Sequence, residues 1–96
     1  MMKYLQRAWS DGEDDIEMKN VLAAIAEIKE MDDEHGAFWV GTEDEEYVLE
    51  TDKSLKMICV IDGKQINYQA NDWQEVERLY QLLLKEDFNA LVEAIK

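Results

Sequence analysis

Proline is absent from this chain of 96 residues, and cysteine and histidine occur once each. The single cysteine, Cys59, excludes a disulfide within the chain and fits a reducing compartment. No stretch reaches the roughly 20 apolar residues of a membrane-spanning helix. No apolar run typical of a secretory signal follows the first residues either. We therefore expect a cytoplasmic protein.

Linkers and repeats are lacking as well. No segment is rich in serine and glycine, and no motif recurs at a fixed period. Hydrophobic residues make up 47% of the chain, which suffices for a core and excludes a disordered chain. At this length the expected organisation is one domain, spanning residues 1–96.

Basic residues are scarce. The chain has ten of them and 23 acidic residues, which gives a formal net charge of −13. The excess is local: residues 11–52 hold sixteen Asp or Glu and only two lysines, whereas the rest of the chain is nearly neutral. A field of this sign repels the phosphates of nucleic acids and anionic lipid surfaces. We therefore expect binding neither to nucleic acid nor to a membrane.

The spacing of apolar residues predicts a first helix over residues 13–31. Its apolar face consists of Met18, Val21, Leu22, Ile25 and Ile28. The acids of residues 13–15 would then lie in the first turn, where the helix dipole favours them. Gly36 is expected to act as a left-handed C-cap.

Alternating apolar residues predict five strands. Their expected ranges are 3–9, 37–42, 46–51, 55–61 and 65–70. The Asp62-Gly63 pair is the strongest hairpin signal, because a type I′ turn requires positive φ angles. It predicts that Ile61 lies opposite Lys64, with apolar pairs following along one face.

Two helices are predicted after the last strand. Asn71 and Gln74 form a capping-box pattern at the start of the first, which would end near Glu86 and Asp87. A short helix then begins near Phe88. The prediction is therefore an α+β fold of order β-α-β-β-β-β-α-α, with an antiparallel sheet of four to five strands and helices mainly on one face.

Acidic residues cluster at three places, and the predicted path of the chain brings two of these together. The first helix would run roughly 27 Å, and the following strand would return about 20 Å toward its start. The expected result is one acidic rim, with the Asp32–Glu34 cluster at the far end. We predict that the rim binds a protein through Asp11, Glu13, Asp14, Asp15, Glu43, Asp44, Glu45 and Glu46.

The sequence offers little support for catalysis, a metal or a cofactor. The acidic runs lack the spacing of a calcium loop. Asp33, Glu34 and His35 place ligand types side by side, but no second histidine or spaced carboxylate supports a metal site there. Cys59 falls on the apolar side of a strand, which favours a core residue over a nucleophile. We therefore expect no enzyme, no catalytic residues, no metal site and no cofactor.

The second face of the predicted sheet is partly apolar, because Trp39, Ile58 and Val60 alternate with core positions. Such a face needs a cover. We expect the strand at residues 3–9 or the last helix to provide it, and the alternative cover is another protein.

The leading hypothesis is a non-enzymatic interaction module that binds a basic protein partner through the acidic rim. One version is a small bacterial immunity- or antitoxin-type protein that blocks a basic nuclease toxin. The alternative is a homo-oligomer, such as a homodimer, with a structural or regulatory role and an interface on the apolar sheet face.

Overall fold

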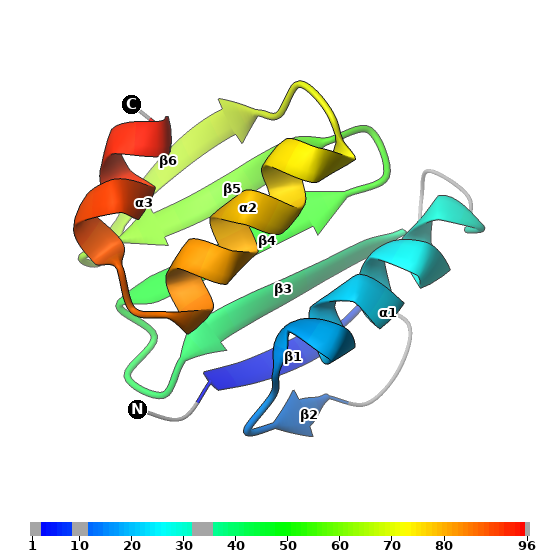
Figure 1. The fold of residues 1–96 in the computed structure, drawn as a ribbon, viewed down its shortest axis with the longest axis horizontal. Coiled ribbons are helices and arrows are strands. Elements are labelled where there is room, and N and C mark those ends of the chain that lie inside the picture. Colours follow the sequence, from blue (N-terminus) through cyan, green and yellow to red (C-terminus); the bar gives the residue numbers. More distant parts are fainter. Residues whose placement is uncertain (1–2, 9–11, 32–35, 96) are drawn as a thin grey trace.

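Three helices pack on one face of a six-stranded antiparallel sheet in the computed structural model, which describes residues 3–8, 12–31 and 36–95 (Figure 1). The strands are β1 Lys3–Arg7, β2 Glu13–Asp14, β3 Ala37–Thr42, β4 Tyr47–Asp52, β5 Lys56–Ile61 and β6 Lys64–Gln69. The helices are α1 Met18–Lys29, α2 Trp73–Leu84 and α3 Phe88–Ile95. The predicted α+β class and antiparallel sheet are confirmed. The strand number and the element order were wrong, because β2 precedes α1.

The sheet has the strand order β2-β1-β3-β4-β5-β6, and every pair of neighbours is antiparallel. The β5–β6 hairpin has the predicted register, with Ile61 opposite Lys64 and Cys59 opposite Ile66. Asp62 and Gly63 have φ angles of 53° and 79°, as a type I′ turn requires. Local turn chemistry therefore determines the register of this hairpin.

The helix predicted over residues 13–31 begins later, at Met18. Glu13 and Asp14 form β2 instead, pairing with Leu5 and Tyr4 of β1, and Asp15 then turns the chain with a φ angle of 53°. Pairing with β1 satisfies the backbone groups of an acidic stretch that has no apolar side chain to bury. The first turn of α1 therefore contains no acidic residue.

The end of α1 also differs from the prediction. The helix ends at Lys29, and its C-cap is Glu30, whose φ of −93° lies in the right-handed region, so Gly36 is not the C-cap. Leu22, predicted on the buried face, has 44% of its surface exposed. Trp9, Asp11, the Asp32–Glu34 cluster and His35 lie outside the described residues.

The core lies between the sheet and the helices. Alternate side chains of the four longer inner strands meet the apolar stripes of the helices. Its fully buried large side chains include Leu5, Phe38, Leu49, Met57, Leu79, Tyr80, Leu83 and Leu91. Tyr80 stacks on Phe38 with ring centroids 5.2 Å apart and ties α2 to β3.

The N-cap of the second of the three helices, α2, lies one residue later than predicted. Asp72 is the N-cap and accepts a hydrogen bond from the backbone N–H of Glu75 at 2.8 Å. The Glu75 carboxylate in turn accepts the backbone N–H of Asn71 at 2.7 Å and the hydroxyl of Tyr68 at 2.6 Å. The capping pair is therefore Asp72 and Glu75, and the Asn71–Gln74 prediction was wrong by one position.

Candidate protein-interaction surface

One face of the sheet has no helix of the described residues on it (Figure 1). We call it the open face. The predicted covers do not reach it: β1 is a strand of the sheet itself, and α3 packs on the helical side, where Phe88 stacks on Tyr47 with ring centroids 3.9 Å apart. The face therefore remains uncovered within the described part of the chain.

Apolar side chains cross the middle of the open face. Val48 of β4 lies opposite Val60 of β5, and Trp39 of β3 shares the next row with Ile58. Trp39, Val48 and Val60 are half-buried, and Ile58 is 38% exposed. The partly apolar second face that alternation predicted is therefore present.

A hollow of about 380 Å³ lies where β1, β2 and the β3–β4 turn meet, lined by Lys3, Tyr4, Asp14, Glu43 and Glu45. We call it the rim hollow. Its acids come from two of the three predicted clusters: pairing of β2 with β1 places Asp14 there, and the tight turn after Thr42 places Glu43 and Glu45. The structure thus brings these two clusters together.

The one base that lines the rim hollow is already engaged. The Lys3 ammonium donates a hydrogen bond to Glu86 at 2.8 Å, and this ion pair joins β1 to the segment between α2 and α3. Lys3 thereby lowers the pKa of Glu86. Among the described residues, no base forms an ion pair with Asp14, Glu43 or Glu45. The carboxylates of the rim hollow are therefore not neutralised within the described chain.

Tyr4 forms the floor of the rim hollow by lying against Gly41, its partner in β3. A Cβ atom on Gly41 would come within 2.8 Å of the Tyr4 hydroxyl oxygen, so the ring position requires a glycine there. The Tyr4 hydroxyl lies 3.4 Å from Glu45. Burial, followed by the negative charge of Glu45, raises the pKa of Tyr4.

The other predicted rim acids have different places. Glu13 binds the guanidinium of Arg7 at 3.3 Å, and Arg7 also binds Glu27 of α1 at 2.7 Å, so Glu13 helps to hold β1, β2 and α1 together. Asp15 forms the turn before α1, and Glu46 is exposed beside the β3–β4 turn. These residues do not line the rim hollow.

Asp44 stabilises the turn that carries the rim acids. Its Oδ1 accepts the Thr42 hydroxyl at 2.6 Å and the backbone N–H of Glu46 at 3.1 Å. The Thr42 hydrogen bond, followed by that from Glu46, lowers the pKa of Asp44. Asp44 is therefore a structural residue of this turn.

We expect Asp44→Ala to lower the free energy of unfolding, because the turn loses both hydrogen bonds, whereas Asp44→Asn keeps an acceptor and loses less. The folded-state pKa is lowered, so the stability from the Asp44 carboxylate is complete above its unfolded pKa and disappears as the pH falls through the folded value. Urea unfolding at pH 7 and pH 3 measures this. An equal effect of Asp44→Ala at both pH values would contradict it.

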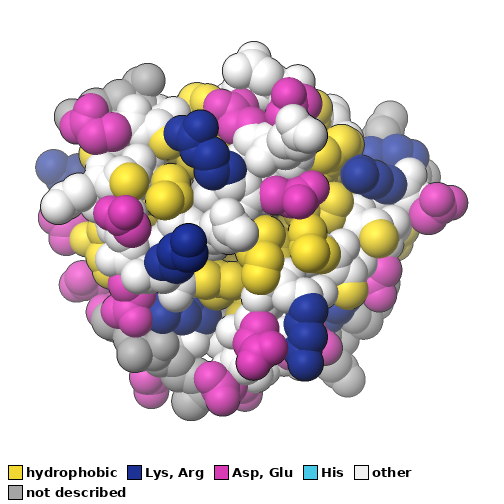
Figure 2. Space-filling model, viewed as in Figure 1, with side chains coloured by type: hydrophobic (Ala, Val, Ile, Leu, Met, Phe, Trp, Pro, Cys, Tyr) yellow, Lys and Arg dark blue, Asp and Glu magenta, His cyan; other side chains and the backbone are white. Residues whose placement is uncertain are grey.

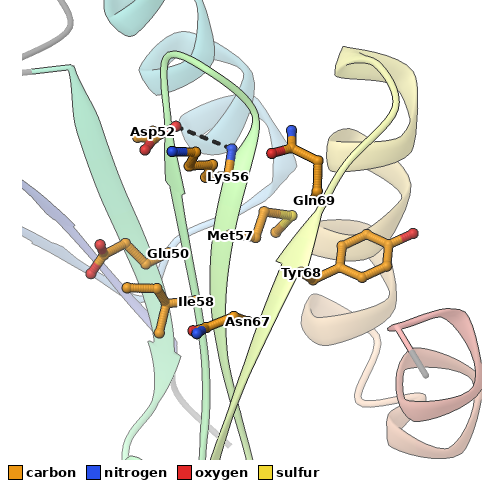
Figure 3. Close-up of a pocket in the computed structure, with 8 residues that line it drawn as sticks. All are labelled: Glu50, Asp52, Lys56, Met57, Ile58, Asn67, Tyr68 and Gln69. Atoms are coloured by element: carbon orange, nitrogen blue, oxygen red, sulfur yellow. Dashed lines mark hydrogen bonds between the residues drawn. The ribbon is translucent and has the colours of Figure 1, made fainter.

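A second hollow, of about 470 Å³, lies over β4, β5 and β6, and we call it the sheet hollow (Figure 3). Figure 3 shows Glu50, Ile58 and Asn67 on the side away from the helices, while Tyr68 points toward them. Its lining residues are Glu50, Asp52, Lys56, Met57, Ile58, Asn67, Tyr68 and Gln69. The hollow combines carboxylates, amides and an apolar side chain.

Two acids of the sheet hollow have different environments. Asp52 accepts the backbone N–H of Ser54 at 2.9 Å and that of Lys56 at 3.1 Å, so it is part of the β4–β5 turn. Glu50 is half-buried between its cross-strand neighbours Trp39 and Ile58. Burial, followed by the charge of Asp52, raises the pKa of Glu50. Within the part of the chain that the structure describes, its carboxylate has no hydrogen-bond or ion-pair partner.

The sequence analysis did not identify Glu50. The alternation pattern could have indicated its place on the open face, because Glu50 lies between two buried residues of a predicted strand, Leu49 and Thr51. What the sequence lacked was the neighbouring strand: burial of Glu50 comes from Trp39 and Ile58, which lie 11 and 8 residues away in the chain.

The helical side of the molecule differs in its charges. Figure 2 shows basic and acidic side chains intermixed over this side, with apolar side chains between them. Within residues 3–8, 12–31 and 36–95, no group of three or more His, Cys, Asp or Glu side chains is arranged so that it could hold a metal ion. No helix in those ranges is long and apolar enough to cross a membrane.

Neither a scan against protein-family models nor comparisons with curated proteins and with solved structures found a match for this chain. The function must therefore be inferred from the geometry and charge of its surfaces.

Proposed function

We propose that this protein is a non-enzymatic interaction module that binds a basic protein partner through an acidic surface centred on the rim hollow. The observation that supports it most is the convergence of Asp14 with Glu43 and Glu45. These acids come from segments almost 30 residues apart in the chain. Lys3, the one base beside them, is paired with Glu86.

The physical basis of this proposal is electrostatic. The carboxylates that line the rim hollow belong to a protein with a net charge of −13, and together they produce a potential that attracts cations. Complementary charge accelerates association and favours a partner of opposite sign. A small immunity- or antitoxin-type protein that blocks a basic nuclease is one concrete version of such a module.

The test is a charge-matched comparison of variants. The first, which we call the rim variant, is Asp14→Asn/Glu43→Gln/Glu45→Gln. It removes the three acids of the rim hollow and leaves Asp44 intact. The control, Glu30→Gln/Glu77→Gln/Asp87→Asn, removes three acids from the helical side. Its third substitution replaces a carboxylate oxygen with an amide oxygen, which can still accept the backbone N–H of Ala90. Net charge changes equally in both variants, so a difference between them reports position.

Both variants and the unchanged protein would be immobilised and exposed to an extract of the native host at low and high salt. Retained proteins would be identified, and a purified partner titrated against each variant. We expect a basic partner that is lost as salt rises, with an affinity at least about tenfold weaker for the rim variant only. Equal loss in both variants, or no partner at either salt, would refute the proposal.

The second candidate is a homo-oligomer that buries the open face. The apolar residues of that face, Trp39, Val48, Ile58 and Val60, favour it. Its role would be structural or regulatory. Light scattering tests it: a monomer at high protein concentration argues against this candidate.

A further inference from the structure

We propose that the open face is the docking surface for an arginine-bearing, partly apolar segment of the partner protein, with an arginine guanidinium bound to Glu50. This inference rests on the proposed function, because it specifies how the basic partner is held. It adds an apolar contact area and a carboxylate outside the rim hollow.

The shape and composition of the open face suit an interface. The apolar side chains of Trp39, Val48 and Val60 lie on the open face beside Ile58, which itself lines the sheet hollow. Interfaces commonly have such an apolar centre, rich in aromatic residues, with a polar rim around it. The residues that would contact a partner therefore form one continuous band across the sheet.

The charges of the two hollows favour a cationic segment. The two hollows are lined by five carboxylates and two lysines, and Lys3 is paired with Glu86. Lys56 is then the one base left at these hollows among the described residues. A cationic segment offsets this charge, whereas an acidic or neutral one does not.

The surroundings of Glu50 favour arginine as its partner. Its carboxylate is half-buried and without a partner in the described chain, and its cross-strand neighbour in β3 is the aromatic residue Trp39. A guanidinium can bind a carboxylate through two parallel N–H donors and also lie on an aromatic ring. A lysine ammonium lacks the planar two-donor geometry, so an arginine suits this position better.

The charges also argue against a second copy of this chain as the occupant. Face-to-face pairing of two copies would join two chains of net charge −13 each across surfaces on which carboxylates outnumber free bases. Like charges brought together across an interface oppose association.

The probe is a short synthetic peptide in which arginine and valine alternate, with blocked ends. One comparison peptide has lysine in place of arginine, and another has glycine in place of valine. Binding would be followed by heteronuclear NMR and calorimetry against the unchanged protein, the rim variant, Glu50→Gln and Glu77→Gln. The last is the matched control, a half-buried acid on α2 that undergoes the same substitution.

We expect the arginine–valine peptide to shift the amide signals of Trp39, Glu50 and Ile58. Its dissociation constant should rise at least about tenfold in Glu50→Gln, since the neutral amide has one acceptor oxygen in place of two and cannot form the charged two-donor pair, and stay unchanged in Glu77→Gln. The lysine and glycine peptides should bind more weakly. Thermal melting checks that Glu50→Gln folds. A further variant, Ile58→Asn, weakens the apolar centre of the open face and should also bind the peptide more weakly.

Several outcomes would overturn this inference. They are equal affinity of Glu50→Gln and the unchanged protein, signal shifts confined to the helical side or to the free edge of β6, and a dimer that Ile58→Asn dissociates. If the rim variant loses the peptide while Glu50→Gln keeps it, the inference fails and the proposed function stands. If none of the basic peptides binds, both are refuted.

Discussion

Replacing Tyr80 with phenylalanine is expected to lower the free energy of unfolding by about 1–3 kcal/mol. The Tyr80 hydroxyl is fully buried; it donates to the carbonyl oxygen of Leu49 at 3.0 Å and lies 2.7 Å from the Thr51 hydroxyl. Because its single proton goes to Leu49, Thr51 must donate to it. The substitution would leave the buried Thr51 hydroxyl without its acceptor.

A double-mutant cycle with Thr51→Val separates this effect from packing. Thr51→Val removes the donor but keeps Tyr80 bonded to Leu49, so it should cost less than Tyr80→Phe. The double variant should then be more stable than the sum of the two losses predicts, by about 0.5–1.5 kcal/mol. Urea unfolding of the four proteins measures these values. Strict additivity would show that the two hydroxyls do not interact.

The thiol of Cys59 is expected to react with a thiol reagent at pH 8 at least about 1,000-fold more slowly in the folded protein than in urea. Its side chain is fully buried in the core, and burial raises its pKa to about 11, so it is both inaccessible and protonated. Labelling then requires unfolding, whose free energy is about 5 kcal/mol or more for a typical domain. Rapid labelling of the native protein would contradict this placement.

The same group should make the fold sensitive to alkali. The folded-state pKa of Cys59 lies above its ordinary value of 9.0. Between pH 9 and about pH 11, the unfolded chain releases the thiol proton while the folded protein retains it. The free energy of unfolding therefore falls as the pH rises from about 9 to 11, by up to about 1.4 kcal/mol per pH unit for this proton. Cys59→Ala should show a shallower decline over the same range.

The part of the fold that could be predicted depends on neighbours in the chain. The Asp62-Gly63 turn sets its own φ angles and thereby the register of β5 and β6. The last two helices follow from the spacing of their apolar residues, and only the cap was displaced, from Asn71 to Asp72. Where preference and pattern agree within a few residues, the local sequence suffices.

The errors arose where distant segments decide the structure. Periodicity favoured a helix from Glu13, but hydrogen bonding to β1 made Glu13 and Asp14 a sixth strand. Leu22 fits the apolar spacing of α1, yet it lies largely exposed. A three-residue turn then separates β2 from α1, and its geometry, with Asp15 at positive φ, is not visible in an acidic run.

The candidate site shows the same division. The sequence by itself determined that negative charge is concentrated in residues 11–52, that one sheet face is partly apolar and that Cys59 belongs to the core. Only the tertiary structure decided which acids meet. Pairing of β2 with β1 brings Asp14 to Glu43 and Glu45, and pairing of β4 with β3 and β5 half-buries Glu50. Charge is a property of composition, whereas desolvation and the distance between charges arise only when separate strands pair.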